Sequence, residues 1–394
     1  MSEFWCSNWE QKQVGELCDV IDPHPSHRAP REEPNGIFFL GIGDLKEDGE
    51  VIGDKARRVS PEIFDEHQDY YRITDNTIGF CRVASVGKVI EFRSDYPFKI
   101  TISPTLAIIE PKDIDKKFLA YCLRSRGISD QVSSLSSGST RESLGIKMLR
   151  ELMVPVPPLP EQKKIAEILS GIDKVLTSLQ LHADKLRLAR DEVVATFFAE
   201  ESKTDEFAEI RSFGEIVTGS TPPTNNPLNY GGVMPFISPG DIGDSAVVAE
   251  TKSTLSAAGA AMSRVIPPSS VCVVCIGSTI GKVALTTTES ATNQQINALT
   301  PGAYDPFFML AAISHMKNEI RSAASTHAVP IINKSRFGEI SIPKPSIERQ
   351  RQFGNYISSS HKMLFHIMVE IQKYQYLKKA VSSDLLSGRK RVSV

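Results

Sequence analysis

Residues 154–169 read VPVPPLPEQKKIAEIL, and this stretch decides the fold because a proline-rich strand end leads directly into a long helix. Proline has no amide hydrogen, so the first prolines cannot lie inside a helix, whereas Pro160 suits a first helical turn. From Ile165 to Phe197 apolar residues recur mostly every three or four positions, which is typical of a coiled-coil seam. The pattern predicts one helix of about 40 residues, roughly 60 Å long.

A second helix of the same kind is predicted near the C-terminus. After Pro345 the same spacing recurs from Phe353 to Leu385, and Gly388 is a suitable helix stop. Chain order favours an antiparallel pair, because the second globular region must return this helix alongside the first. The alternative is that each helix packs on its own globular domain.

The chain also repeats itself. Four segments match in the same order at offsets of 199, 197, 194 and 188 residues, which predicts an internal duplication. The matched segments are Gly15–Leu17 with Gly214–Ile216, Phe39–Asp44 with Phe236–Asp241, Cys81–Val89 with Cys275–Val283, and Val154–Pro157 with Ile342–Pro345.

Each copy begins with about 150 residues of short apolar runs broken by turn residues, a pattern of strands with a few short helices. The expected fold is α+β: two tandem mixed α/β domains joined by two long antiparallel coiled-coil helices, as a pseudo-twofold internal repeat. The expected strands include 36–40, 77–81, 270–275 and 340–342, and the expected short helices include 115–125 and 307–322. The expected domains are 1–155, first globular domain; 156–203, central long helix; 204–344, second globular domain; and 345–394, distal long helix and C-terminal tail.

Composition places the chain among ordinary globular proteins. Of its 394 residues 41% are hydrophobic and 23% are charged, and six scattered cysteines do not indicate a disulfide framework. The longest apolar runs are too short to cross a membrane and the N-terminus lacks the features of a secretory signal, so we expect a cytoplasmic protein. A net charge of −2 excludes coating of nucleic acid by bulk charge, but residues 344–394 hold ten Lys and Arg against three acidic residues. Local basic patches remain open.

Catalytic patterns are incomplete. The segment 277–283 resembles a phosphate-binding loop, but its glycines are too close together and Val283 replaces the magnesium-binding hydroxyl. Residues 221–224 (TPPT) lack the groups with which a methyltransferase holds a base, and Asp95 with Glu110–Lys112 is a common chance match to a nuclease pattern. No cysteine or histidine spacing indicates a metal site, and His24 and His27 are expected to be solvated. The chain therefore reads as a binding protein rather than an enzyme.

The segment 159–169 (LPEQKKIAEIL) and the closing segment 384–392 (DLLSGRKRV) resemble the DNA-specificity subunit of type I restriction–modification systems. The resemblance covers the whole chain, although 347–351 (IERQR) departs from the expected element in the second copy. It implies that each globular domain is a target-recognition domain for one half of a bipartite double-stranded DNA site, with the helices fixing the spacing. It also implies two methyltransferase subunits and restriction/translocase subunits as partners, no membrane, and no catalytic residue or cofactor on this chain. S-adenosylmethionine, ATP and Mg would then be held by the partners.

Candidate DNA contacts are basic residues in loops and turns, where side chains reach base edges or phosphates. They are Arg57, Arg58, Lys88, Arg93, Arg141, Lys282, Lys334 and Arg336. Two other function classes remain open: a self-contained nuclease or methyltransferase with two recognition domains, and a coiled-coil scaffold that does not bind DNA.

Overall fold

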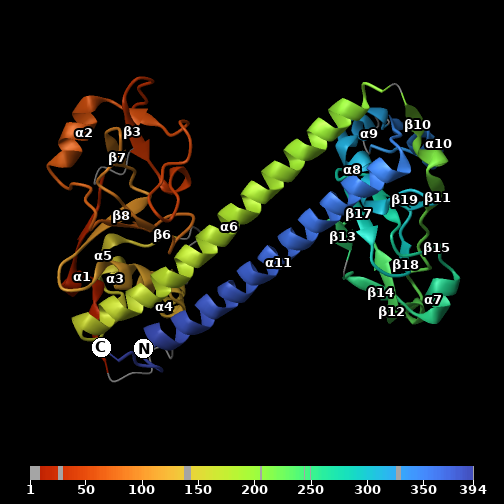
Figure 1. The fold of residues 1–394 in the computed structure, drawn as a ribbon. Helices are drawn as coiled ribbons and strands as arrows, with labels where there is room; N and C mark the ends of the chain where they lie inside the picture. Colours follow the sequence, from red (N-terminus) through yellow and green to blue (C-terminus); the bar gives the residue numbers. More distant parts are fainter. Residues whose placement is uncertain are drawn as a thin grey trace. The chain divides into compact units, whose positions relative to one another are not determined.

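The computed structural model describes residues 9–24, 30–136, 143–204, 206–243, 245–248, 250–324 and 330–393. The chain divides into two compact units (Figure 1). Unit 1 comprises Met1–Thr177 and Gln372–Val394, and unit 2 comprises Ser178–Ile371. Each unit therefore holds one globular domain together with parts of both long helices.

The strands of unit 1 form two small sheets and a separate pair in the described residues. Their bounds are β1 Glu10–Gln13, β2 Cys18–Ile21, β3 Ile37–Leu40, β4 Arg58–Val59, β5 Ile78–Cys81, β6 Val89–Glu91, β7 Ile100–Ile102, β8 Leu106–Pro111 and β9 Met153–Val156. One sheet is antiparallel in the order β2-β8-β5-β6. The other has the order β4-β3-β7, with β3 parallel to β7, and β1 pairs with β9.

Unit 2 repeats this plan. Its strands are β10 Phe207–Glu209, β11 Gly214–Thr218, β12 Tyr230–Ile237, β13 Val247–Val248, β14 Ser253–Leu255, β15 Val265–Ile266, β16 Val271–Val274, β17 Val283–Thr286, β18 Ser290–Thr292, β19 Ile296–Pro301 and β20 Ser341–Pro343. The sheet orders are β11-β19-β16-β17-β13 and β14-β12-β18-β15, and β10 pairs with β20. Apart from the added edge strands β13 and β15, the pairings match those of unit 1, including the parallel pair β12–β18. The predicted internal duplication is confirmed.

The central strands are buried on both faces. All four residues of β16 are fully buried, with Val271 and Val273 in one hydrophobic cluster and Cys272 and Val274 in another. Neighbouring side chains on a strand point to opposite faces, so the strand joins a core under the helices to a core under the second sheet. Cys275 belongs to the first cluster, apart from Cys272, as the strand alternation predicts.

The short helices pack on these sheets. They are α1 Val14–Leu17, α2 Pro61–Gln68, α3 Lys116–Leu123, α4 Arg126–Ser136, α5 Ile146–Arg150, α7 Ala257–Ala261, α8 Pro306–His315, α9 Lys317–Ala323 and α10 Lys334–Gly338, with 3₁₀ turns η1 Ile42–Asp44, η2 Ile210–Ser212 and η3 Pro227–Asn229. Asp115 and Asp305 cap α3 and α8 identically, each accepting a hydrogen bond of 2.9 Å from the amide three residues on. The predicted single helix over 307–322 is wrong: Met316, at ψ +17°, interrupts it between α8 and α9.

The two predicted long helices are confirmed as α6 (Leu159–Glu201, 43 residues) and α11 (Ile347–Leu386, 40 residues). Gly388 ends α11 with a φ of +75°, in the left-handed region that glycine adopts without strain. None of the helices in the described part of the chain has the length and hydropathy needed to cross a membrane.

A buried glutamine fixes the start of each long helix. The Gln162 side chain donates to the Pro157 carbonyl and accepts from the Asp115 amide, both at 2.8 Å, so it ties α6 to the cap of α3. Gln350 likewise donates to the Pro345 carbonyl at 2.8 Å. The Pro-to-Gln spacing visible in the sequence is therefore a helix anchor.

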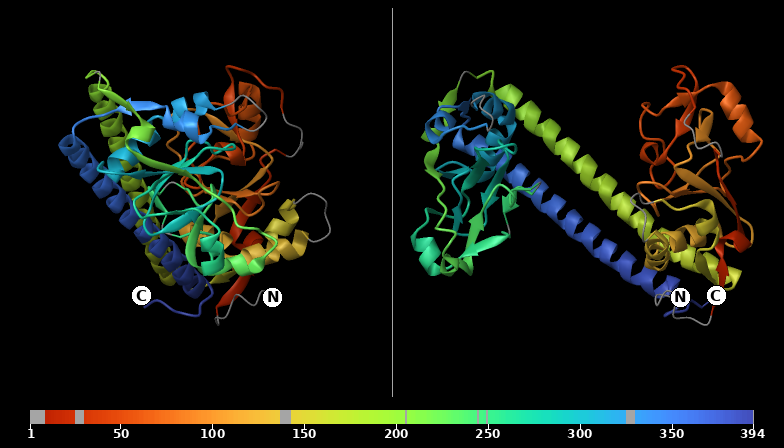
Figure 2. Two further views of the ribbon diagram at one scale, coloured as in Figure 1. Left: turned by 90° about the vertical axis from the view of Figure 1, so that its right-hand side faces the viewer. Right: turned by 180° about the vertical axis from the view of Figure 1, so that it is seen from behind.

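Within each unit the two long helices run antiparallel, side by side (Figure 2). In unit 1, Glu161 of α6 binds Arg391 just beyond α11, and Asp173 binds Lys378 at 2.5 Å. Along the pair, the residue numbers of the contacting side chains therefore increase on α6 while they decrease toward and within α11, as in an antiparallel arrangement. The buried residues Ile165 and Leu169 show that α6 also packs into the core of its own domain, so pairing and domain packing occur together.

In unit 2 the same antiparallel relation holds. The Phe197 and Phe353 rings stack with centroids 3.8 Å apart, and Arg349 of α11 binds Glu201 of α6 at 2.6 Å. Arg187 lies 3.5 Å from the sulfur of Met368.

Candidate nucleic-acid interface

The turns that follow β3 and β12 are built in the same way. The Asp44 carboxylate accepts a hydrogen bond from the Gly41 amide, and Asp241 accepts one from the Ser238 amide, both at 2.8 Å. Burial acts to raise the pKa of Asp241, but hydrogen bonds from Ser238 and the Lys252 amide hold that pKa below its ordinary value. Both turns are therefore closed by an aspartate side chain, and the lowered pKa of Asp241 favours its ionised form.

The two predicted Gly-Lys turns reach these same segments. Gly87 and Gly281 have φ of +94° and +85°, and the lysine that follows each glycine folds back over the turn. Lys88 Nζ lies 3.5 Å from the Ile42 carbonyl, and Lys282 Nζ lies 3.1 Å from the Ile242 carbonyl. Each lysine thus holds the turn after β3 or β12, which leaves its remaining N–H groups for another acceptor.

Two neighbouring arginines lie at β4. The Arg58 guanidinium stands 3.9 Å from the centre of the Phe38 ring and donates to the Gly36 carbonyl. Arg57 donates to the Pro30 carbonyl, while its Nε is buried without a hydrogen-bond partner in the described residues. Both side chains are half-buried and positioned by the backbone around β3.

Arg93 is the most open of the unit 1 candidates with a described position. Its side chain is 46% exposed, its Nε lies 3.3 Å from Asp95, and its guanidinium lies 5.7 Å from the centre of the Tyr96 ring. Arg141 lies outside the described residues.

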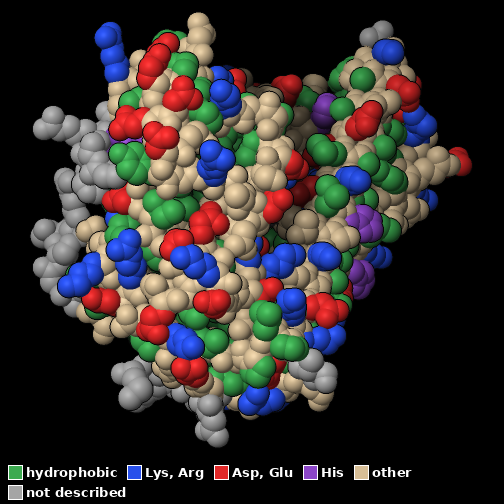
Figure 3. Space-filling view, turned by 90° about the vertical axis from the view of Figure 1, so that its left-hand side faces the viewer, with side chains coloured by type: hydrophobic (Ala, Val, Ile, Leu, Met, Phe, Trp, Pro, Cys, Tyr) green, Lys and Arg blue, Asp and Glu red, His purple; other side chains and the backbone are tan. Residues whose placement is uncertain are grey.

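Lys334 and Arg336 are exposed on α10, whose cap is the Asn333 side chain accepting from the Arg336 amide at 2.9 Å. This helix packs on β11 and η2, whereas Lys282 lies at the turn after β12. The structure therefore brings Arg58 and Lys88 to one segment, 36–45, but separates the unit 2 candidates into two regions. On the face drawn in Figure 3, Lys and Arg side chains are interspersed with Asp and Glu.

The residues of the nuclease-like pattern are each engaged elsewhere. Asp95 pairs with Arg93, Lys112 lies 2.6 Å from Asp19, and Glu110 accepts from the Thr77 hydroxyl. Burial raises the pKa of Glu110 despite that hydrogen bond. Within the described ranges no three His, Cys, Asp or Glu side chains are grouped to hold a metal ion.

The expectation that His24 is solvated is wrong. His24 is 7% exposed and its Nδ1 lies 2.8 Å from Nε2 of His67, which in turn contacts the Thr101 hydroxyl at 2.5 Å. Burial, with His24 alongside, lowers the pKa of His67. The partners are 43 and 34 positions apart in sequence, so no local pattern signals this buried network. His27 lies outside the described residues.

Comparison with known families identifies what the two units are. The family model of the type I restriction modification DNA specificity domain matches residues 6–185 and again 203–373. The two matches cover most of the chain, and each falls largely on one globular domain and the long helix that follows it.

Individual relatives agree. The HindI type I restriction enzyme specificity subunit of Haemophilus influenzae is 29% identical over 189 residues, which is 46% of this chain and 41% of that protein. The protein of Methanocaldococcus jannaschii assigned as the MjaX specificity subunit is 21% identical over 97% of this chain and 94% of its own length. The crystal structure of the type I restriction–modification S subunit from M. genitalium has the same fold, with a TM-score of 0.65 and 17% identity over 96% of each chain.

The chain belongs to the family of type I restriction–modification DNA-specificity subunits. It is a DNA-recognition protein with two specificity domains, and the predicted fold class is confirmed by both the family and the structure.

Proposed function

We propose that this chain is the non-catalytic subunit that selects the DNA site of a type I restriction–modification complex. Each specificity domain would read one half of a bipartite site, and the long helices would set the separation of the halves. The observation that carries the proposal is the repeated topology: two domains of one plan, each attached to segments of the same two continuous helices. Two rigidly joined readers add their binding free energies without the entropy cost of a loose linker.

The partners and cofactors follow from that role. Two methyltransferase subunits would dock on the chain and bring S-adenosylmethionine, and restriction subunits would bring ATP and Mg. The protein would work in the cytoplasm, where it meets DNA. The proposed borders are 1–155 and 204–344 for the recognition domains, with 156–203 and 345–394 as the spacers.

Altering the helix length tests the spacing role. Inserting one heptad into the exposed middle of both α6 and α11 lengthens each helix by about 10 Å and preserves the apolar seam. Mapping methylated adenines in cells should show each half-sequence unchanged and the spacer longer by about three base pairs, because one base pair rises about 3.4 Å. An unchanged spacer in a folded, active variant would overturn the proposal.

The candidate DNA contacts remain proposals and can be ranked by exposure. The exposed residues Arg93, Lys334 and Arg336 could reach phosphates, with Arg93 doing so beside its partner Asp95. Lys88 and Lys282 would do so only through N–H groups not bound to carbonyls. Replacing an exposed candidate with Gln should weaken DNA binding of the reconstituted complex and reduce its salt dependence. The matched control is Lys185→Gln, an exposed lysine on α6.

The remaining alternatives predict different results. A self-contained enzyme would cleave or methylate DNA when the purified chain is given Mg and a methyl donor, and we expect neither reaction. A scaffold that does not bind DNA would leave the reconstituted complex unable to distinguish target DNA from random DNA in a gel shift.

A further inference from the structure

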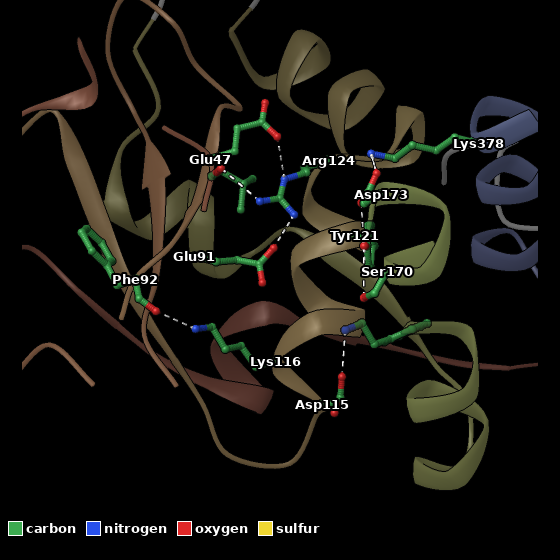
Figure 4. Close-up of polar contacts among 12 residues, drawn as sticks. Glu47, Glu91, Phe92, Asp115, Lys116, Tyr121, Arg124, Ser170, Asp173 and Lys378 are labelled. Atoms are coloured by element: carbon green, nitrogen blue, oxygen red, sulfur yellow. Dashed lines mark hydrogen bonds and ion pairs between the residues drawn. The ribbon is translucent and has the colours of Figure 1, made fainter. Parts of the chain in front are cut away.

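The duplicated units carry different side chains where the long helices cross the globular domain. In unit 1 a groove of about 640 Å³ lies at this crossing, and Tyr121 and Lys378 are among the residues that line it. The Tyr121 hydroxyl of α3 donates to Asp173 at 2.7 Å, and Lys378 binds the other oxygen of the same carboxylate at 2.5 Å (Figure 4). Arg124, the residue directly after α3, is likewise paired with Glu91 at 2.8 Å. Each of these cations has a carboxylate partner.

The internal repeat identifies the matching residues of unit 2. Aligning the anchors Gln162 and Gln350 places His361 at the position of Asp173, and the same offset places Arg190 at that of Lys378. Aligning the helix caps Asp115 and Asp305 places Ala311 at the position of Tyr121. Unit 2 therefore has neither the phenol ring nor the carboxylate that unit 1 carries at this crossing.

Unit 2 has its own groove of about 560 Å³, and Ala311 is among the residues that line it. It lies wholly within unit 2, between the two long helices on one side and α8 with β17 on the other. Its apolar wall is formed by Val194, Leu310, Ala311 and Ile357. The volume is in the range of small-molecule sites, which run from about 300 to 1,000 Å³.

The polar wall of the groove is predominantly basic. It carries Arg190, Lys282, Lys317, His315 and His361, against one acidic residue, Asp191. Asp191 is 66% exposed and accepts from Arg190 at 2.8 Å, so it neutralises one cation only. Lys317 makes no ion pair within the described residues. Arg190, Lys282 and Lys317 against Asp191 give the wall two net positive charges, and a concave surface of one sign concentrates counter-ions.

The protonation state of His361 depends on whether an anion is bound beside it. Burial lowers the pKa of His361 to about 4, and the neighbouring Arg190 lowers it further than Asp191 can restore. The groove around it also holds Lys282, Lys317 and His315. The imidazole is therefore neutral at pH 7, and a bound anion would favour its protonation and add a charge-assisted hydrogen bond.

We propose that this groove of unit 2 binds a phosphate-bearing small molecule of the size of a nucleoside monophosphate. Arg190 and Lys317 hold the phosphate, His361 donates to it, and the apolar wall accepts the less polar body of the ligand. The site is separate from the candidate DNA contacts except for Lys282, and it does not depend on the proposed DNA-recognition role.

Titration of the full chain with inorganic phosphate, adenosine 5′-monophosphate and adenosine tests the proposal by calorimetry. We expect the monophosphate to bind more tightly than phosphate and adenosine to show no binding. Arg190→Gln and Lys317→Gln should each weaken binding at least tenfold. The matched control is Lys378→Gln at the equivalent position of unit 1, which should leave the affinity unchanged.

Narrowing the groove is an independent test. Ala311→Tyr adds a ring to the groove lining and His361→Asp adds a carboxylate beside Arg190. The double variant should abolish binding, with circular dichroism and the melting temperature showing that the chain still folds. Equal binding of adenosine, no binding of either phosphate probe at millimolar concentration, or unchanged affinity in the Lys317 variant would each overturn the proposal. Weaker duplex DNA binding in the Arg190 and Lys317 variants, without binding of free phosphates, would also overturn it and assign the groove to the DNA backbone.

Discussion

Units 1 and 2 share a topology but close the ends of their helices with opposite charges. Glu161 of unit 1 and Arg349 of unit 2 occupy the same position, one residue before the anchoring glutamine. Glu161 pairs with Arg391 and Arg349 pairs with Glu201, so acid and base have exchanged places. Unit 2 also has a stacked aromatic pair, Phe197 and Phe353, at this end of its long helices. The comparison teaches that the apolar pattern maintains the fold while the polar partners at each crossing vary.

The largest expected loss of stability comes from truncating a buried side chain near the end of each long helix. Phe198 of α6 and Leu386 of α11 occupy matching positions, and both are 2% exposed. Phe198→Ala should lower the free energy of unfolding of unit 2 by about 3–5 kcal/mol, and Leu386→Ala that of unit 1 by about 2–5 kcal/mol, because each leaves a cavity. Both tryptophans, Trp5 and Trp9, belong to unit 1, so urea unfolding followed by their fluorescence reports that unit.

Because both tryptophans belong to unit 1, the stability of unit 2 is measured by hydrogen exchange of its peptides. Leu188→Ala, at a side chain 71% exposed on α6, is the control and should change neither signal. An equal shift of the fluorescence midpoint in the Phe198 and Leu386 variants would show that the two units unfold as one.

Much of this fold could be predicted because the signals are local. The apolar spacing after Pro160, the matching Gly-Lys turns and the Pro-to-Gln spacing all lie within short windows. The geometry of the candidate site could not be predicted in the same way. Nothing near Lys88 in sequence shows that its ammonium folds back onto the Ile42 carbonyl. Likewise Glu161 and Arg391 are 230 positions apart, and only the folded chain brings them together.

A second difference between the units appears on acidification. The pKa of His361 is about 4 in folded unit 2, against an ordinary 6.5, because of burial and Arg190. The unfolded chain therefore binds more protons between these values, and the free energy of unfolding falls as pH falls through this window. At about 1.4 kcal/mol per pH unit, the loss by pH 5 is about 2 kcal/mol. His361→Gln should remove that part of the acid sensitivity.

The measurement compares wild-type and His361→Gln stability at pH 7.5 and pH 5, with hydrogen exchange locating the change in unit 2. His182→Gln, an exposed histidine on α6, serves as the control and should keep the wild-type slope. If the His361 variant loses as much stability as wild type, the imidazole is not held neutral by its surroundings.

The helix anchors provide a smaller contrast. Gln162 satisfies two backbone groups, whereas the Oε1 atom of Gln350 is buried without a hydrogen-bond partner in the described residues. Gln162→Ala should therefore cost about 1 kcal/mol more than Gln350→Ala, because it leaves the Asp115 amide as well as the Pro157 carbonyl without a partner. Denaturant unfolding read separately in the two units provides the test, and equal costs would mean that Gln350 has a second partner in solution.

The smallest expected effect comes from exchanging the crossing residues themselves. Asp173→His removes the pair with Lys378, whose two side chains are each 35% exposed, and the acceptor of the Tyr121 hydroxyl. Such partly exposed pairs contribute less than about 1 kcal/mol, so the fluorescence midpoint of unit 1 should fall only slightly. The reciprocal His361→Asp should stabilise unit 2 by a comparable amount, since it gives Arg190 a new carboxylate. Opposite signs in the two units would show that the charges at each crossing depend on the local partner, whereas a loss in both would mean that each crossing is adapted to its present residue.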